Sequence, residues 1–126
     1  MSESKWVEKL WGSEEILVNG DRYCAKLLFI RGGFRSSLHY HLVKDETFIA
    51  WDGVTALEVA NTDGTYEVRF LRARERDSVH LPPGVAHRFK AVTLTATILE
   101  VSTPHSDDDV VRIEPSAHIE DDASTV

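Results

Sequence analysis

Cysteine and basic residues are scarce in this chain of 126 residues, and each shortage excludes a class of protein. Cys24 is the single cysteine, so the chain can form no internal disulfide and no cysteine-rich metal cluster. Lys and Arg number 14 against 21 Asp and Glu, which gives a net charge of −7. We therefore expect no nucleic-acid partner and no anionic membrane surface, because both require clustered positive charge.

Long apolar segments are also missing. No apolar run approaches the roughly 20 residues that a membrane-spanning helix needs. The first residues, 1–6, lack the basic and then apolar profile of a secretory signal. The sequence therefore predicts a cytoplasmic protein without a membrane partner, and its length leaves room for one domain.

Short segments rich in β-branched and aromatic residues follow one another from residue 14 onward, with turn residues between them. They predict strands over residues 15–19, 23–30, 37–42, 46–51, 54–60, 66–71, 78–81, 88–91 and 93–103. Residues 61–64 read Asn-Thr-Asp-Gly, a strong hairpin signal because Asn, Asp and Gly tolerate positive φ. Strands at this spacing predict an all-β sandwich or barrel.

The most informative stretch places two histidines and a glutamate between two glycines. His39 and His41 are two residues apart on an expected strand, so their imidazoles project from the same face. Glu46 follows a tight turn that can bring its carboxylate beside both rings. Five residues separate Gly33 from His39, and four separate the second histidine from the glutamate. Six more separate Glu46 from Gly53.

A third imidazole, His87, follows a rigid turn at Pro83-Gly84. Imidazole and carboxylate ligands suit manganese, iron, cobalt, nickel or zinc. The spacings match the first cupin motif in full and the core of the second, so the chain resembles the cupin superfamily. That resemblance implies a double-stranded β-helix (jelly-roll barrel) that binds one divalent transition metal through His39, His41, Glu46 and His87. The alternative is that the three histidines are unrelated polar residues on strands.

The flanking residues carry a narrower resemblance. Trp11-Gly12, then Tyr23 and Lys26, and an Asp-Asp-Val-Val-Arg ending at residues 108–112 resemble the cupin domain of type II phosphomannose isomerases. The cupin D-lyxose isomerases are a looser relative. Lys44-Asp-Glu-Thr-Phe stands where those phosphomannose isomerases carry Arg-x-Glu-x-Trp, and the nucleotidyltransferase domain that often precedes such cupins is not in this sequence. The resemblance implies a mannose-6-phosphate-isomerase-like enzyme acting on a small polar substrate, a sugar or sugar phosphate.

An aldose–ketose isomerisation needs a group that moves a proton between two carbons. Glu100 shares a strand face with the apolar residues at 92, 94, 96 and 98, which is an unusual place for an idle carboxylate. Lys26 is in phase with Leu28 and Ile30 by the same count. We expect Glu100 to be the proton-transfer base, with Lys26 and Arg88 holding or protonating substrate oxygens. The alternative is a structural ion pair of Glu100 with Lys26 or Arg88.

Three functions are compatible with these residues: a metal-dependent sugar or sugar-phosphate isomerase or epimerase, an iron-dependent dioxygenase, and a non-catalytic module that binds a sugar or nucleotide sugar. The expected organisation is an N-terminal segment over residues 1–21, a cupin barrel over residues 22–103 and an acidic tail over residues 104–126, frayed at its far end. Trp6 and Trp11 in the first segment predict packing across a partner subunit, and hence a homodimer.

Overall fold

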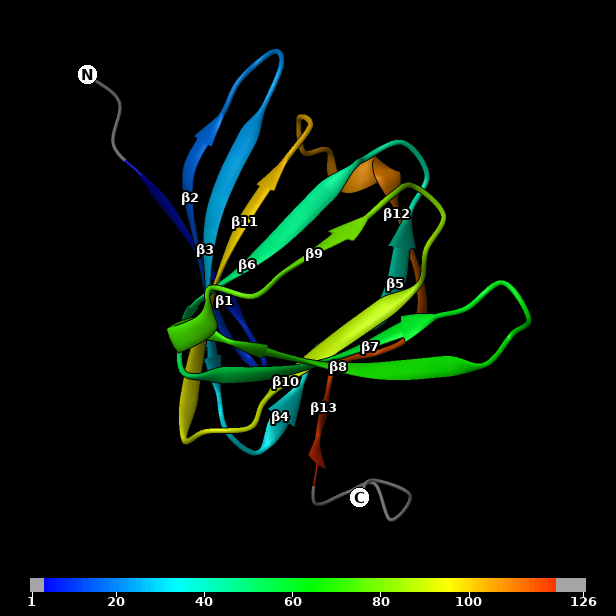
Figure 1. Ribbon diagram of the computed structural model, residues 1–126. Coiled ribbons are helices and arrows are strands. Elements are labelled where there is room, and N and C mark those ends of the chain that lie inside the picture. Colours follow the sequence, from blue (N-terminus) through cyan, green and yellow to red (C-terminus); the bar gives the residue numbers. More distant parts are fainter. Residues whose placement is uncertain (1–3, 120–126) are drawn as a thin grey trace.

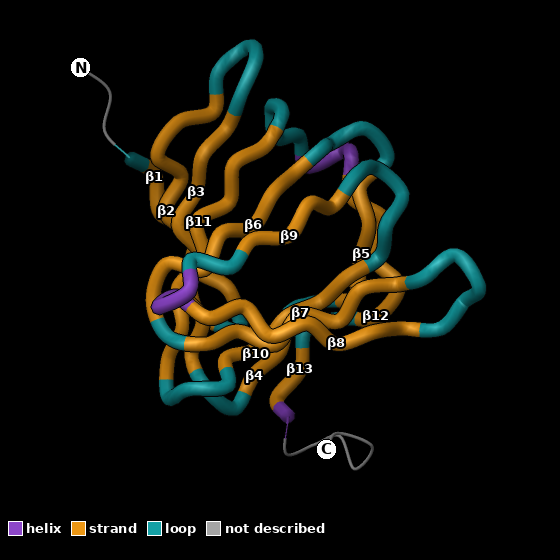
Figure 2. The backbone as a smooth tube through the Cα atoms, in the orientation of Figure 1, coloured by secondary structure: helices purple, strands orange, loops and turns teal. Residues whose placement is uncertain are grey.

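The computed structural model describes residues 4–119, which form two antiparallel sheets that face each other (Figure 1). The first sheet contains, in spatial order, β1 (Lys5–Lys9), β2 (Gly12–Asn19), β3 (Cys24–Arg31), β11 (Thr95–Ser102), β6 (Glu46–Asp52) and β9 (Ser78–Leu81). Strands make up most of the chain, as Figure 2 shows. The prediction of an all-β jelly-roll fold is confirmed.

The second sheet is organised around β10 (His87–Ala91), which pairs with β5 (Leu38–His41), β4 (Phe34–Arg35) and β7 (Val54–Ala60). Its remaining strands are β8 (Tyr66–Arg72), β12 (Val110–Glu114) and β13 (Ala117–His118). Two short 3-10 helices, η1 (Ala73–Glu75) and η2 (Asp107–Asp109), lie in connections. Neither of these helices in the described part is long and apolar enough to cross a bilayer.

The core lies between the two sheets because alternate residues of each strand point inward. In β3 every second residue from Cys24 to Ile30 is buried, as the period-2 pattern of a half-buried strand requires. Phe48, Leu57 and Ile98 meet these residues from β6, β7 and β11. Strand β11 begins only at Thr95, so the residues at 92 and 94, expected on its inward face, are 53% and 89% exposed instead.

Trp11 and Gly12 lie where the chain turns from β1 into β2, and each has a separate structural reason. Trp11 is buried and packs edge-on against Phe89, with 4.9 Å between ring centroids. Gly12 has a φ of 149°, and a Cβ added there would lie 1.8 Å from the carbonyl oxygen of Phe29. Only glycine fits this close approach of β2 to β3.

The N-terminal segment is part of the barrel wall, since β1 and β2 form a hairpin whose second strand pairs with β3. Trp11 belongs to the core of its own chain, so it cannot reach a partner subunit as expected. Trp6 is 54% exposed and stacks on Phe29 at 5.5 Å. The homodimer stays a prediction, and it now depends on Trp6 without Trp11.

The expected acidic tail is wrong for residues 104–119, because this segment completes the second sheet. Strand β12 pairs with β5, placing Val110 opposite His41 and Arg112 opposite His39. The β-branched residues at 110, 111 and 113 supply a strand between acidic neighbours, and pairing satisfies the backbone groups of β5. The far end, where fraying was expected, lies outside the described residues.

Candidate metal centre

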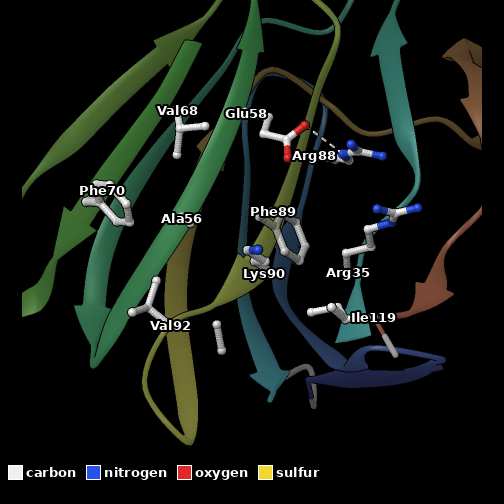
Figure 3. A pocket seen from close by; sticks show the side chains of 11 residues that line it. Arg35, Ala56, Glu58, Val68, Phe70, Arg88, Phe89, Lys90, Val92 and Ile119 are labelled. Carbon is white, nitrogen blue, oxygen red and sulfur yellow. Dashed lines mark hydrogen bonds and ion pairs between the residues drawn. The ribbon is translucent and has the colours of Figure 1, made fainter. Parts of the chain in front are cut away.

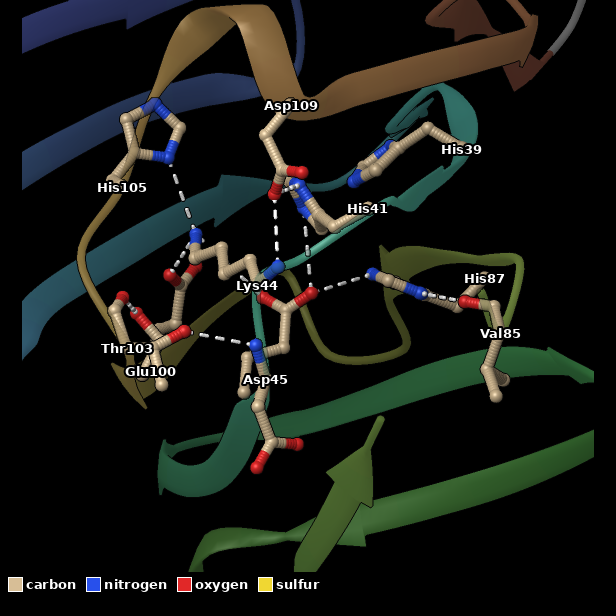
Figure 4. Close-up of polar contacts among 12 residues, drawn as sticks. His39, His41, Lys44, Asp45, Val85, His87, Glu100, Thr103, His105 and Asp109 are labelled. Carbon is tan, nitrogen blue, oxygen red and sulfur yellow. Dashed lines mark hydrogen bonds and ion pairs between the residues drawn. The ribbon is translucent and has the colours of Figure 1, made fainter. Parts of the chain in front are cut away.

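Three imidazoles converge from two neighbouring strands. His39 and His41 project from β5 and His87 begins β10, where its Cα is paired with that of His39. The ring centroids are 5.2 Å apart for His39 and His41, 4.8 Å for His39 and His87, and 6.3 Å for His41 and His87. Figure 4 shows the three rings around a shared space. The parity of β5 and the pairing of β5 with β10 thus produce the cluster.

Glu46 brings a carboxylate to the same place from the first residue of β6. Its Oε2 atom lies 3.4 Å from Nε2 of His41 and 3.4 Å from Nε2 of His87. Two donors of one metal ion are separated by about this distance when each bond is about 2.1 Å long. The structure therefore brings all four predicted ligands together.

The hydrogen bonds of the histidines orient their other nitrogen atoms for a cation. Nδ1 of His87 donates to the Val85 carbonyl at 2.9 Å, which assigns the free lone pair of this ring to Nε2. Nδ1 of His39 lies 3.0 Å from the Ser37 carbonyl and 2.8 Å from the Ser37 hydroxyl oxygen. Nε2 of His87 is buried without a hydrogen-bond partner beside the Glu46 oxygen. Such an orphaned acceptor next to a carboxylate fits a bound cation.

The four side chains do not have the geometry of ligands around a bound metal ion. Within residues 4–119, no three His, Cys, Asp or Glu side chains already have the geometry of a metal site. Metal binding would therefore require these side chains to rotate toward the ion. The donor set and the orphaned nitrogen fit a divalent transition metal, and its binding stays a prediction.

Burial keeps the imidazoles in the neutral form that binds metals. It lowers the pKa of His39 to about 3, with the neighbouring rings of His87 and His41 acting in the same direction. Burial and the charge of Lys44 lower the pKa of His41 to about 4, and burial lowers the pKa of His87. Burial followed by the charge of Glu100 raises the pKa of Glu46 to about 8, so an incoming cation would displace a proton there.

Asp109, at the end of η2, supports the cluster from outside. Its carboxylate accepts the backbone N–H groups of Val43 at 2.7 Å and Lys44 at 3.0 Å, and it lies 3.5 Å from Nδ1 of His41 (Figure 4). The contact with His41 is an ion-pair distance and not a hydrogen bond, since this Nδ1 is buried without a hydrogen-bond partner. Local spacing could not select Asp109, because this residue lies 68 positions after His41.

A buried ion pair adjoins the cluster. Nζ of Lys44 lies 2.5 Å from Oε2 of Glu100 and 3.9 Å from Oε1 of Glu46, and the Lys44 and Glu100 side chains are 2% and 5% exposed. Burial opposes both charges, but their mutual attraction outweighs it. The pKa of Lys44 is therefore raised by Glu100, and the pKa of Glu100 is lowered by Lys44 and then Lys26.

Sequence reasoning assigned Lys44 no role at the metal centre. Lys44 lies between β5 and β6, outside any strand, so no strand phase predicts the direction of its side chain. Its Nζ also lies 3.3 Å from Nδ1 of His105. Glu100 does pair with a buried lysine, but with this one and not with Lys26 or Arg88.

Lys26 and Arg88 have different locations. Lys26 is buried on β3, opposite Glu100 on β11, and its Nζ lies 3.5 Å from Glu14. Arg88 follows His87 on β10 and points to the opposite side, where it pairs with Glu58 at 2.8 Å (Figure 3). The expectation that Arg88 reaches substrate beside the metal ligands is therefore corrected. Consecutive strand residues face opposite sides of a sheet.

The structure has two concave regions, and Arg88 and the histidine cluster lie in different ones. A groove of about 560 Å³ on the outer face contains Arg88. A cavity of about 980 Å³ adjoins the histidine cluster. Its charged and imidazole-bearing lining residues are Lys5, Glu8, Lys9, Glu14, Lys26, His39, His41, Lys44, Glu46, Glu100, His105, Asp107 and Arg112. The cavity therefore brings Glu100 and Lys26 together with three of the four predicted ligands, His39, His41 and Glu46, whereas His87 does not line it.

The two facing antiparallel sheets, with the predicted ligands on β5, β6 and β10, have the architecture of a cupin. The fold is similar to that of the capsular polysaccharide assembling protein CapF from Staphylococcus aureus, with a TM-score of 0.80 and 15% identity over 90% of this chain and 32% of that one. Oxalate decarboxylase from Bacillus subtilis gives a TM-score of 0.76 and 17% identity over 88% of this chain and 30% of that one. At these identities the likeness shows the fold alone.

The chain belongs to the family described as "Mannose-6-phosphate isomerase C-terminal", whose model matches residues 2–115. It is 32% identical to the xanthan biosynthesis protein XanB of Xanthomonas campestris pv. campestris over 90% of this chain and 24% of that protein. It is 28% identical to a mannose-1-phosphate guanylyltransferase of Sinorhizobium fredii over 82% of this chain and 19% of that protein. The chain thus spans about a fifth to a quarter of the length of these relatives.

Proposed function

We propose that this cupin is a metal-dependent isomerase or epimerase of a sugar or sugar phosphate, with mannose 6-phosphate as the first substrate to test. The proposal depends most on the buried Lys44–Glu100 pair, which lines the same cavity as three of the predicted metal ligands, His39, His41 and Glu46. The membership in the mannose-6-phosphate isomerase C-terminal family supports this choice of substrate. The cytoplasmic location is proposed on the same basis.

His39, His41, Glu46 and His87 would hold one divalent transition metal. A metal ion in this place supplies Lewis-acid polarisation to two neighbouring sugar oxygens. The Val85 carbonyl orients His87 for this role through a hydrogen bond, and the Asp109 carboxylate lies beside His41. Burial keeps the imidazoles neutral, so their lone pairs are available at physiological pH.

Glu100 is the proposed proton-transfer group. The pKa of this buried carboxyl is lowered by Lys44 and then Lys26, which outweigh its burial, so it is ionised and ready to accept a proton from a sugar carbon. Returning that proton to the adjacent carbon, while the proton of the C2 hydroxyl passes to the C1 oxygen, exchanges an aldose and a ketose. Lys44, 2.5 Å away, would compensate the charge change on Glu100. Lys26, which lines the same cavity, would hold or protonate a sugar oxygen.

The test compares wild-type protein with Glu100→Gln and with Glu58→Gln, a matched variant in the outer groove. Each protein is loaded with manganese, cobalt, nickel or zinc, and conversion of mannose 6-phosphate to the 2-ketose phosphate is followed by NMR in D2O. We expect Glu100→Gln to lose about 10²–10⁴-fold in turnover with unchanged metal content, since this is the range for a general base. Glu58→Gln should retain full turnover.

Two outcomes would replace the proposal. Protein loaded with ferrous iron that consumes oxygen with an organic substrate, but converts no sugar, would be a dioxygenase. Metal-loaded protein that binds sugar phosphate without converting any sugar or sugar phosphate would be a binding module. Full turnover of Glu100→Gln would leave the isomerase in place and remove Glu100 from its mechanism.

A further inference from the structure

Arg112 lies in the cavity wall beside the candidate metal centre. It belongs to β12, and its Cα is paired with that of His39 on β5. Side chains of directly paired residues lie on the same face of a sheet, and both residues line the cavity. The guanidinium is therefore close to the predicted metal ligands.

An irregularity in β12 removes the nearest carboxylate from Arg112. Glu114 lies two residues further along the strand and would share the face of Arg112 in a regular strand. The register shifts between these two residues, however. Glu114 consequently reaches Arg88, with 3.5 Å between Oε1 and Nη1, on the side of the outer groove. A bulge of this kind re-aims one side chain and leaves its neighbour in place.

The other carboxylates of the cavity are mostly taken by closer partners. Three such pairs are Glu14 with Lys26 at 3.5 Å, Glu100 with Lys44 at 2.5 Å, and Asp107 with His105 at 2.9 Å. Glu8, a further acidic residue of the wall, belongs to β1 in the other sheet. Within residues 4–119, Arg112 forms no hydrogen bond or ion pair, and its side chain is open to solvent.

An arginine that is unpaired, accessible and aimed into a cavity is suited to an anionic ligand. Its planar guanidinium presents paired N–H donors that match two oxygens of a phosphate. The buried Lys26 and Lys44 already have carboxylate partners, whereas Arg112 lies in the cavity wall on the strand paired with that of His39. We propose that Arg112 anchors the phosphate group of a phosphorylated sugar whose hydroxyl groups reach the histidine cluster.

This inference names the substrate class of the proposed function and rests on that function for the sugar, but the anion site can be tested without turnover. Inorganic phosphate is titrated into zinc-loaded and chelator-treated protein, and binding is followed by ¹H–¹⁵N NMR of backbone amides and arginine Nε–H groups. The variants are Arg112→Gln, Arg112→Lys and the control Arg69→Gln. Arg69 pairs with Glu67 at the surface, so this control removes the same charge away from the cavity.

We expect phosphate to shift the Nε–H resonance of Arg112 and its neighbours in both forms of the wild-type protein. Arg112→Gln should weaken phosphate binding at least about tenfold, the loss expected for a charge-assisted bidentate contact. The phosphate affinity of Arg112→Lys should lie between those of the wild type and Arg112→Gln, because lysine retains the charge but not the paired N–H donors of the guanidinium. Arg69→Gln should bind phosphate as the wild type does. Thermal melting verifies that each variant is folded.

Turnover then separates the two proposals. If the isomerase is active, Arg112→Gln should raise the KM for the sugar phosphate and leave kcat/KM for the unphosphorylated sugar unchanged. Phosphate binding that depends on Arg112 in a protein with no isomerase activity would support the anchor and refute the isomerase. Phosphate binding that is equal in Arg112→Gln and wild type, whether at the metal or elsewhere, would overturn the anchor whatever the activity.

Discussion

The buried Lys44–Glu100 pair should be strongly coupled, and a double-mutant cycle can measure that coupling. The variants are Lys44→Met, Glu100→Leu and the combination of both. Removing one partner of a buried pair leaves an uncompensated charge and costs about 3–5 kcal/mol, whereas replacing both with apolar residues is close to neutral. The Lys44 and Glu100 side chains are 2% and 5% exposed, and 2.5 Å separates their charged atoms, so the estimate for a buried ion pair applies to them.

The two single changes should differ in size. Glu100→Leu leaves Glu46, at 3.9 Å, as the nearest carboxylate to the Lys44 ammonium, so we expect nearly the full cost. Lys44→Met is milder, because Lys26 also favours the charged form of Glu100. If the double variant is close to neutral, it should be more stable than the sum of the two single effects by about 3 kcal/mol or more.

The assay is urea unfolding of chelator-treated protein at pH 7.5, because bound metal would add its own linkage to stability. The surface pair Arg69–Glu67 is the control. Its atoms are 2.8 Å apart, but the side chains are 47% and 45% exposed, so its coupling should be at most about 1 kcal/mol. A coupling for Lys44–Glu100 no larger than for this control would refute the account of burial given above.

Three further predictions concern the ligands, the close-packed glycine and the cysteine. His87→Ala should reduce bound metal from about one equivalent to less than about a tenth, as measured by elemental analysis. The control His80→Ala, which alters an exposed histidine paired with Asp45, should keep its metal. Equal metal content in the two variants would contradict the ligand set. Gly12→Ala should lower the free energy of unfolding by more than about 2 kcal/mol, because the new Cβ meets a backbone oxygen of β3 at 1.8 Å. Gly20→Ala, whose new Cβ has its nearest atom at 3.9 Å, should cost about 1 kcal/mol or less. Similar urea midpoints for the two variants would argue against the close approach. Burial raises the pKa of Cys24, which is 1% exposed. Its reaction with a thiol reagent should therefore be slow in the native protein, should become faster as the pH rises above 9, and should be fast in urea. Rapid labelling of native protein at pH 8 would show that the thiol is accessible.

Much of the fold was predictable because strand parity and turn residues are local properties. The strand expected over residues 54–60 is β7 in full, and β8 closes the hairpin predicted at residues 61–64. The inward phase of Glu100 with Ile98 is also confirmed by their burial. Strands β1 and β12 were missed because their own residues alternate weakly, and the partner of β12, strand β5, is also distant in sequence.

The sequence by itself determined the all-β class, the cupin resemblance and the set of four candidate ligands, since each depends on residue type and short-range spacing. Only the tertiary structure decided which charges meet. Lys44 lies in a turn without a strand phase, Arg88 faces outward one residue after a ligand, and a bulge separates Arg112 from Glu114. Which strands pair, and which face of each is enclosed, follows from long-range packing that no local spacing encodes.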